Sequence, residues 1–471
     1  MWNQYFIASN LQEAVSLLAK YKDQAKIIAG GTDLILEIER GGHTEINTLI
    51  DISRIAGLDE IYYENDSIHI GALVTHNQAA SSAIIQQYAG CLAEACYQVG
   101  SPQIRNRATI AGNLLTASPA NDTITPLVAL DADLVLISPV GERKIKVADF
   151  YTGVRKTLLQ KNEILKEIII KTQKNAKSSF YKFALRNAQA ISVVNAAVLV
   201  TLNGEVIESA SVALGAVAPT IVRILNIEKA VVGKKISDLT LINFSNLMDG
   251  ISPISDIRSS ANYREEMSSL LVKRCFENIH KSILGQRSMP ENPITLDGRR
   301  GPKDVVEIHE STLIDENHPI ETNINGQSYT FFGAHRKTLL HLVRENAGLV
   351  GSKEGCDEGE CGACTMYLDG KAVMSCLVPA PRAHHARIQT IEGVSDGSTL
   401  HPVQKAFIEE GAVQCGYCTP GFIMSAVKLL EEKPNPSENE IKEAITGNLC
   451  RCTGYYKIVK AIEKAALEDK R

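Results

Sequence analysis

The sequence predicts an α+β protein of several domains, and three observations support this prediction. The chain has 471 residues, 44% of them hydrophobic and 22% charged, which suits two to four ordinary globular domains. Apolar, β-branched runs flank asparagine–glycine turn signals within 193–217 and 320–332. Towards the C-terminus, apolar residues recur at three- and four-residue steps, a spacing that is typical of helices.

Changes in composition divide the chain into five segments. A polar, lysine-rich stretch at 172–178 closes the first, and the second combines strands with a long helix expected over 263–284. The third is rich in proline, glycine and charge without periodicity, so we expect a linker. The fourth opens with a hairpin signal at Asn325-Gly326, and the fifth reads as helical. The expected segments are 1–175, 176–285, 286–319, 320–395 and 396–471.

Eight of the 11 cysteines form two sets near the end of the chain, and the first has the spacing Cys356-x4-Cys361-x2-Cys364-x11-Cys376. This is the plant-type ferredoxin pattern, which binds a [2Fe–2S] cluster. Glycines in the loop allow a tight backbone curl that brings amide N–H groups to the sulfurs. Structural zinc is the alternative, but zinc sites usually use two knuckles of similar form, so we expect iron and sulfide.

The second set is Cys415-x2-Cys418 followed by Cys450-x-Cys452. By spacing alone it fits a cluster, a zinc site or, for the first pair, a redox dithiol. Each pair immediately precedes an expected helix, so four helices that hold a cluster are the simplest arrangement. The expected helices are 401–413, 421–432, 438–446 and 455–467. Three cysteines remain, Cys91, Cys96 and Cys275, and the first two lie in a helical stretch and are expected to be small buried hydrophobes.

Charge and composition exclude several classes of function. The net charge of −5 gives no reason to expect nucleic acid, and no apolar run is long enough to span a membrane. The N-terminus lacks the charged and apolar regions of a signal peptide, and the many thiols favour a reducing compartment, so we expect a cytoplasmic protein. His384 and His385 would point apart on a strand, so we expect them to be exposed to solvent and not a metal pair.

Two stretches of the N-terminal half could bind phosphate or ribose. Residues 26–34 read as a short strand that runs into Gly30-Gly31, where backbone N–H groups can approach a phosphate, although a plain turn has the same signature. The run 100–122 is crowded with small residues, hydroxyls and amides, which suits a polar ligand or a long polar loop. Neither stretch contains G-x-G-x-x-G or a Walker motif.

Both halves of the sequence resemble one family. The ferredoxin-type loop, then QCGYCTPG and GNLCRCTGY, is similar to the iron–sulfur region of the molybdenum hydroxylases, the xanthine dehydrogenase family, over 320–467. AGGTDL and the run from Gly100 to Asp122 resemble the flavin domain of the same family, over about 1–285. In single-chain xanthine dehydrogenases the iron–sulfur domains come first, whereas here the flavin segments do.

The resemblance implies a fold for each segment. It gives a two-part FAD-binding domain (1–175 and the flavoprotein C-terminal domain 176–285), a β-grasp plant-type ferredoxin domain and a four-helix-bundle [2Fe–2S] domain. It implies that Asp122 binds ribose, that Lys182 reaches the flavin and that Gln414 contacts a pterin. The implied FAD-binding residues are Ile27, Ile28, Ala29, Gly30, Gly31, Thr32, Asp33 and Leu34, then Thr109, Ile110, Ala111, Gly112 and Asn113, and finally Asp122, Leu165 and Lys182.

The implied function is electron transfer. The chain is too short to include a molybdopterin domain, so we expect a large molybdenum-cofactor subunit as partner in a hetero-oligomer. Electrons would pass from that partner through two [2Fe–2S] clusters to FAD, and then to NAD+ or another acceptor. We therefore expect no catalytic residues in this chain. A stand-alone NAD(P)H-dependent reductase and a non-enzymatic redox sensor or metal-binding protein remain alternatives.

Overall fold

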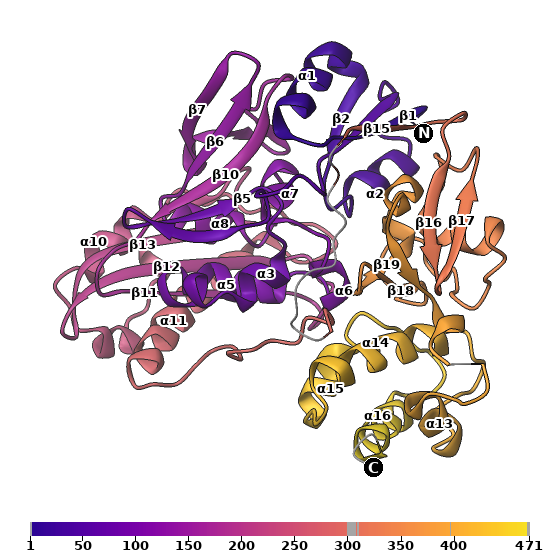
Figure 1. The fold of residues 1–471 in the computed structure, drawn as a ribbon. Helices are drawn as coiled ribbons and strands as arrows, with labels where there is room; N and C mark the ends of the chain where they lie inside the picture. The colour runs from indigo at the N-terminus through magenta and orange to yellow at the C-terminus, as the bar shows by residue number, and fades with distance from the viewer. Residues whose placement is uncertain (1, 299–307, 309, 396, 469–471) are drawn as a thin grey trace. The chain divides into compact units, whose positions relative to one another are not determined.

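The computed structural model describes residues 2–298, 308, 310–395 and 397–468 (Figure 1). The chain forms two compact units, each built from separate stretches of sequence. The first unit comprises Met1–Ala56, Gly100–Ala108 and Ile294–Arg471, and the second comprises Gly57–Val99 and Thr109–Pro293. Each unit is described by itself.

The first unit contains two sheets. The N-terminal sheet has the order β15-β1-β3-β2, with β1 and β2 parallel to the central β3. Its strands are β1 (Gln4–Ile7), β2 (Ala25–Ile28), β3 (Thr48–Asp51) and β15 (Thr312–Ile314), with helices α1 (Leu11–Tyr21), α2 (Leu34–Glu39) and α6 (Pro102–Arg105) in the same unit. The second sheet has the order β17-β16-β20-β18-β19. Its strands are β16 (Ile320–Ile324), β17 (Gln327–Phe331), β18 (Thr365–Leu368), β19 (Lys371–Met374) and β20 (Arg387–Gln389), accompanied by α12 (Leu339–His341).

Four helices close the first unit, each within a few residues of its expected range: α13 (Pro402–Glu409), α14 (Thr419–Glu432), α15 (Glu438–Ala444) and α16 (Tyr456–Glu468). α15 begins with a capping box, in which the Ser437 and Glu440 side chains each accept from the other's backbone N–H. α13 is shorter than expected because the chain turns at Gly411, whose φ of 59° is left-handed.

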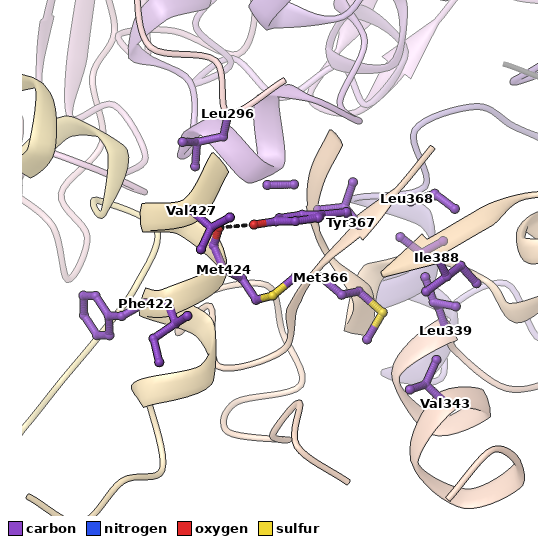
Figure 2. Packing of buried hydrophobic residues seen from close by; sticks show 14 of the residues in the cluster. Leu296, Leu339, Val343, Met366, Tyr367, Leu368, Ile388, Phe422, Met424 and Val427 are labelled. Atoms are coloured by element: carbon purple, nitrogen blue, oxygen red, sulfur yellow. Dashed lines mark hydrogen bonds between the residues drawn. The ribbon is translucent and has the colours of Figure 1, made fainter. Parts of the chain in front are cut away.

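These helices share one core with the second sheet (Figure 2). The Tyr367 hydroxyl of β18 donates to the Met424 carbonyl of α14 at 2.6 Å, and apolar side chains of both elements fill the space around this bond. The labelled members are Leu296, Leu339, Val343, Met366, Tyr367, Leu368, Ile388, Phe422, Met424 and Val427. The two segments that carry the cysteine sets are therefore packed together through a continuous apolar interior.

The second unit has two larger sheets and a small hairpin. One sheet has the order β4-β5-β10-β6-β7, with strands β4 (Ile61–Glu64), β5 (Ser67–Gly71), β6 (Asp133–Ser138), β7 (Gly141–Lys146) and β10 (Ile164–Lys171). The other has the order β11-β12-β13-β14, with strands β11 (Ala176–Phe183), β12 (Val194–Asn203), β13 (Val206–Gly215) and β14 (Val222–Arg223). The expected hairpin at Asn203-Gly204 is confirmed, because Asn203 pairs with Val206. The small hairpin is β8 (Tyr151–Gly153) and β9 (Lys156–Thr157).

Helices of the second unit accompany these sheets, and its long helix α11 (Ala261–Ile283) agrees with the expected range. α5 carries Cys91 and Cys96, which are both fully buried, so their expected role as small hydrophobes is confirmed. The other helices are α3 (His76–Ser81), α4 (Ala83–Tyr88), α5 (Gly90–Gln98), α7 (Ile110–Leu115), α8 (Ile124–Ala129), α9 (Val147–Phe150) and α10 (Leu225–Val231).

Two expectations differ from the structure. Part of the expected linker 286–319 lies outside the described residues, but its Thr312–Ile314 forms β15, antiparallel to β1, and Ile294 and Leu296 are buried. A three-residue strand among charges is too short to show periodicity. The exposed position expected for His384 is wrong: its side chain is 6% exposed because its Nδ1 accepts the Glu321 N–H at 3.1 Å.

Among the described residues, no helix combines the length and apolar character that a membrane span requires.

Candidate metal centres and flavin-binding residues

The first cysteine set lies where a loop enters the second sheet of the first unit. Cys356 and Cys361 are on the loop, Cys364 immediately precedes β18, and Cys376 follows β19 in a single helical turn. The sulfurs of Cys364 and Cys376 are 3.5 Å apart. β18 and β19 pair antiparallel, with Thr365 opposite Met374, so the sheet itself brings these two cysteines together.

Backbone N–H groups of the loop stabilise negative charge on the Cys356 sulfur. Its Sγ accepts the backbone N–H groups of Glu358, Glu360 and Cys361 at 3.3–3.4 Å. Contact with the Cys361 thiol and these amides lowers the pKa of Cys356 to about 5. A thiolate is the form that binds metal, so the backbone favours the ligand state.

The second set is held at helix N-termini, as expected. Cys418 caps α14, and the Sγ atoms of Cys415 and Cys452 are 3.6 Å apart. The Cys418 thiol contacts Cys450, and burial followed by this contact raises its pKa to about 12. Thr453 donates to the Cys450 sulfur through its backbone N–H at 3.4 Å and its hydroxyl at 3.1 Å.

The sulfurs of each set are arranged as two close pairs. Two thiolates on one tetrahedral ion with metal–sulfur bonds of about 2.3 Å lie roughly 3.8 Å apart, and in a Cys₄ zinc site all four sulfurs do so. Here the close pairs are 3.5 and 3.6 Å. In the described part of the chain, which includes all eight cysteines, no three of these sulfurs lie within 4.8 Å of one another. Pairs at this spacing fit a two-iron cluster, with two sulfurs on each iron, and do not fit a single zinc ion.

One backbone hydrogen bond joins the two sets. The N–H of Leu449, next to Cys450, donates to the carbonyl of Cys361 at 2.9 Å. Leu449 is covalently linked to Cys450 and Cys361 belongs to the first set, so a single hydrogen bond separates the two cysteine sets at this point.

The phosphate-binding stretch expected at Ile27–Leu34 is a strand-to-helix turn of the first unit. β2 ends at Ile28, Gly31 has φ 80°, and α2 begins at Leu34. Arg107 holds the turn by donating to the carbonyls of Ala29 and Gly30 at 3.0–3.2 Å. A Cβ on Gly30 would meet the Arg107 carbonyl at 2.3 Å, so this position requires glycine. The sequence predicted a polar binding role for the run 100–122 but did not single out Arg107 within it.

The other expected FAD-binding residues lie in the second unit. Thr109 caps the short helix α7, where its Oγ1 accepts the Gly112 N–H at 2.9 Å. The Asn113 amide oxygen accepts the Thr123 hydroxyl at 2.5 Å, which brings the stretch Thr109–Asn113 next to Asp122. Leu165 of β10 is 2% exposed and packs in the same apolar cluster as Ile110, Ala111 and Leu114.

Asp122 and Lys182 contact each other. The Lys182 Nζ lies 2.6 Å from Asp122 Oδ2, and the two side chains are 6% and 8% exposed. The other carboxylate oxygen accepts the Ser192 hydroxyl at 2.6 Å. Ser192 was not found from the sequence, because a serine 70 residues from its partner carries no local signal.

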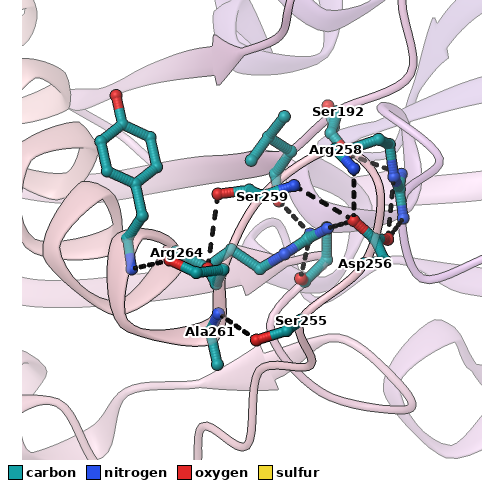
Figure 3. Close-up of polar contacts among 11 residues, drawn as sticks. Ser192, Ser255, Asp256, Arg258, Ser259, Ala261 and Arg264 are labelled. Carbon is teal, nitrogen blue, oxygen red and sulfur yellow. Dashed lines mark hydrogen bonds and ion pairs between the residues drawn. The ribbon is translucent and has the colours of Figure 1, made fainter.

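A second carboxylate, that of Asp256, is connected to Ser192 through the Arg258 side chain (Figure 3). Asp256 accepts hydrogen bonds from Arg258 and Arg264 at 2.7 Å, and Arg258 also donates to the Ser192 carbonyl at 3.1 Å. Burial alone would raise the pKa of Asp256, but these two guanidinium groups hold it well below its usual value. The Asp122–Lys182 pair is thus braced through Ser192.

Comparison with known proteins identifies the types of domain that carry these residues. Four family profiles match: an FAD-binding domain in molybdopterin dehydrogenase (2–171), a CO dehydrogenase flavoprotein C-terminal domain (179–279), a 2Fe-2S iron-sulfur cluster binding domain (322–392) and a [2Fe-2S] binding domain (390–463). The nicotinate dehydrogenase small FeS subunit of Eubacterium barkeri is 48% identical over 146 residues, which are 31% of this chain and 93% of the relative. The FAD-subunit of that organism's nicotinate dehydrogenase is 36% identical over 290 residues, 60% of this chain and 97% of the relative.

The chain belongs to the molybdenum hydroxylase family. A solved carbon monoxide dehydrogenase from Hydrogenophaga pseudoflava agrees, with a TM-score of 0.56 and 30% identity over 60% of this chain and 98% of the solved chain. This molybdenum hydroxylase chain is an oxidoreductase subunit with FAD-binding and [2Fe–2S]-binding domains, flavin first, so the expected cofactors and domain types are confirmed. The FAD-binding residues themselves, the eight cysteines as cluster ligands, the domain boundaries and a specific likeness to xanthine dehydrogenase stay predictions.

Proposed function

We propose that this chain transfers electrons from a separate, large molybdenum-cofactor subunit to FAD and on to NAD+ or another acceptor. The observation that carries the proposal is the sulfur geometry, two close pairs in each set, with the Leu449–Cys361 hydrogen bond between the sets. When bound, the clusters supply one-electron steps and the flavin a two-electron step. No residue of the chain is proposed to act on the oxidised substrate.

The chain's own residues hold these groups and set their charge. Backbone amides around Cys356 and the Thr453 hydroxyl beside Cys450 stabilise thiolate charge. We infer that the turn between Ile28 and Leu34, whose carbonyls at Ala29 and Gly30 Arg107 holds in place, receives phosphate through backbone N–H groups. Thr109–Asn113 and Asp122 supply polar contacts to FAD, Lys182 a cation and Leu165 apolar packing. The proposed domains are those of the sequence division, with a β-grasp fold at 320–395 and a four-helix bundle at 396–471.

The substrate class follows from the relatives and lies with the partner. Both halves of this chain match subunits named for nicotinate dehydrogenase, and other matches are named for nicotine 6-hydroxylase, aldehyde oxidoreductase and xanthine dehydrogenase. We propose hydroxylation of an N-heterocycle, or otherwise of an aldehyde, with oxygen from water. The complex would be a hetero-oligomer.

The test begins with protein purified without oxygen. About four irons, one FAD and two distinct [2Fe–2S] signals by electron paramagnetic resonance (EPR) after dithionite reduction support the proposal. Zinc in place of iron, or no flavin, overturns it. Co-purification of a large molybdenum-containing protein supports the electron-transfer role. Rapid NADH oxidation with no such partner in the cell extract supports the stand-alone reductase instead.

A further inference from the structure

One short helix of the first unit contacts three cofactor-binding elements. From α6, Gln103 donates a hydrogen bond to Ser425 of α14, the helix that follows Cys418. Ile104 packs against an apolar cluster that includes Cys364 and Cys376. Two residues beyond the helix, Arg107 holds the Ala29-Gly30 turn. This segment belongs to the run that the sequence associated with flavin, yet its side chains also meet the surroundings of both cysteine sets.

Gln103 lies in a fully buried polar cluster. Its Nε2 donates to Ser425 Oγ at 3.0 Å and to Asn448 Oδ1 at 3.1 Å. The Ser425 hydroxyl also donates to Asn448 Oδ1 at 2.7 Å, and Asn448 Nδ2 donates to the Gly362 carbonyl at 3.1 Å. Gln103 and Ser425 are 0% exposed and Asn448 is 2% exposed, so water does not compete for these bonds.

Three chain segments meet at this cluster without spare volume. A Cβ on Gly362 would lie 2.2 Å from the Gly447 carbonyl oxygen, and a Cβ on Gly447 would lie 2.2 Å from Gln103 Oε1. The first-set loop, the segment before Cys450 and the α6 helix are therefore in direct contact. A change in the Gln103 side chain must therefore shift the backbone next to Asn448.

The position of Asn448 determines the bond between the two centres. Asn448 precedes Leu449, whose N–H donates to the Cys361 carbonyl at 2.9 Å. Asn448 is fixed from one side by Gln103 and Ser425 and from the other by Gly362, the residue after Cys361. The cluster thus clamps the two backbone segments that the Leu449–Cys361 bond connects.

We propose that Gln103 is a positioning residue for electron transfer between the two centres, acting through Asn448 on the Leu449–Cys361 hydrogen bond. The inference rests on the proposed function. In the step concerned, one electron leaves one centre, which is oxidised, and reduces the other, and no covalent bond or proton is exchanged. The flavin part of the sequence thereby controls contact between the iron–sulfur parts.

The decisive variant is Gln103→Leu, which keeps the volume and removes both donors. The first readout is hydrogen–deuterium exchange at the Leu449 amide, resolved by fragmentation mass spectrometry. We expect exchange about fivefold faster, the factor that corresponds to a net hydrogen bond of about 1 kcal/mol. The second readout is rapid-freeze-quench EPR after mixing with limiting dithionite. We expect equilibration between the two signals to slow by about tenfold or more, because small misplacements cost positioned reactions that much.

The matched control is Tyr367→Phe. It removes one buried hydrogen bond, from Tyr367 to Met424, in the same core but outside the Gln103 cluster. It should lower stability without changing the Leu449 exchange relative to neighbouring amides or the equilibration rate. Ser425→Ala keeps the Gln103–Asn448 bond, so it should change the Leu449 exchange and the equilibration rate in the same direction but by less. This variant replaces Gln103→Leu in the test if Gln103→Leu does not accumulate as folded protein.

The outcomes separate the inference from the function on which it rests. If wild-type protein lacks two iron–sulfur signals, the proposed function fails. If both signals are present with unchanged midpoint potentials, and Gln103→Leu leaves Leu449 exchange and equilibration at wild-type values, the inference is wrong. An equal slowing in Tyr367→Phe also overturns it, since the effect would then come from general loosening of the core.

Discussion

The two cysteine sets have nearly the same sulfur–sulfur distance within a close pair, but they differ in exposure to solvent. The close sulfur pairs are 3.5 Å apart in the first set and 3.6 Å in the second. Cys364 and Cys376 are 3% and 1% exposed and belong to an apolar cluster, whereas Cys415 and Cys452 are exposed. The sulfur–sulfur distance is what a shared metal ion requires, whereas the exposure of each cysteine depends on the surrounding fold. One close pair of the first set is thus buried in its own chain, whereas one close pair of the second set faces solvent.

The largest expected effect separates the sets by their ligands. Cys376→Ser and Cys452→Ser should each reduce iron from about four to about two per chain and remove one EPR signal. Only Cys376→Ser should also lower the free energy of unfolding appreciably, by about 1–3 kcal/mol, because it buries a hydroxyl among apolar side chains. Iron analysis, EPR and urea unfolding measure this. Cys275→Ser, a buried cysteine outside both sets, should keep all the iron, and equal destabilisation by the two ligand variants would contradict the contrast in burial.

Access from solvent gives the next contrast. With excess EDTA and mild oxidant, the signal of the second centre should disappear well before that of the first, because two of its cysteines, Cys415 and Cys452, are exposed. The two EPR signals, followed over time, report this directly. Simultaneous loss would show that exposure of the sulfurs does not control release, and protection of the second signal in the complex with the molybdenum subunit would sharpen the interpretation.

Acid should weaken the segment that contains the first centre. Burial, then His385 and Arg54, lowers the pKa of His384 to about 4. The unfolded chain binds more protons between pH 6.5 and 4, so the stability from neutral His384 is full above pH 6.5 and is lost as the pH falls towards 4, by roughly 1–2 kcal/mol after screening. His384→Asn, which keeps an acceptor for Glu321, should flatten this dependence in urea unfolding. The exposed neighbour variant His385→Asn should flatten it less, because burial is the larger cause of the lowered pKa, and a flat wild-type profile would refute the prediction.

The smallest effect concerns tuning of the second centre. Thr453→Val removes the hydroxyl that donates to the Cys450 sulfur at 3.1 Å. Losing about 1 kcal/mol of stabilisation for the reduced, more negative centre should lower its midpoint potential by about 40 mV. An EPR redox titration should show this shift for the second signal only. A shift of both signals would mean that the variant perturbs the shared core.

Local patterns predicted much of the fold and both metal centres. The turn at Asn203-Gly204 and the four C-terminal helices depend on nearby residues and were correctly expected. The cysteine spacings predicted two [2Fe–2S] domains, and the family profiles confirm both. Gln103 could not be found, because its partners lie 322 and 345 residues away. His384 was misjudged for the same reason, since burial depends on Glu321 and Arg54. The FAD-binding residues came from resemblance to a family, and no local rule assigns them.

β15 bears on how such a chain could exist as two polypeptides. The separate FeS and FAD subunits of the E. barkeri nicotinate dehydrogenase match different parts of this one chain. If the chain were cut between Gly298 and Ile308, β15 would stay with the iron–sulfur fragment, while its pairing partner β1 would stay with the flavin fragment. Reassembly would then require one polypeptide to donate an edge strand to the other's sheet, a form of strand addition that supplies affinity through main-chain hydrogen bonds. Fusion makes this pairing intramolecular and independent of protein concentration.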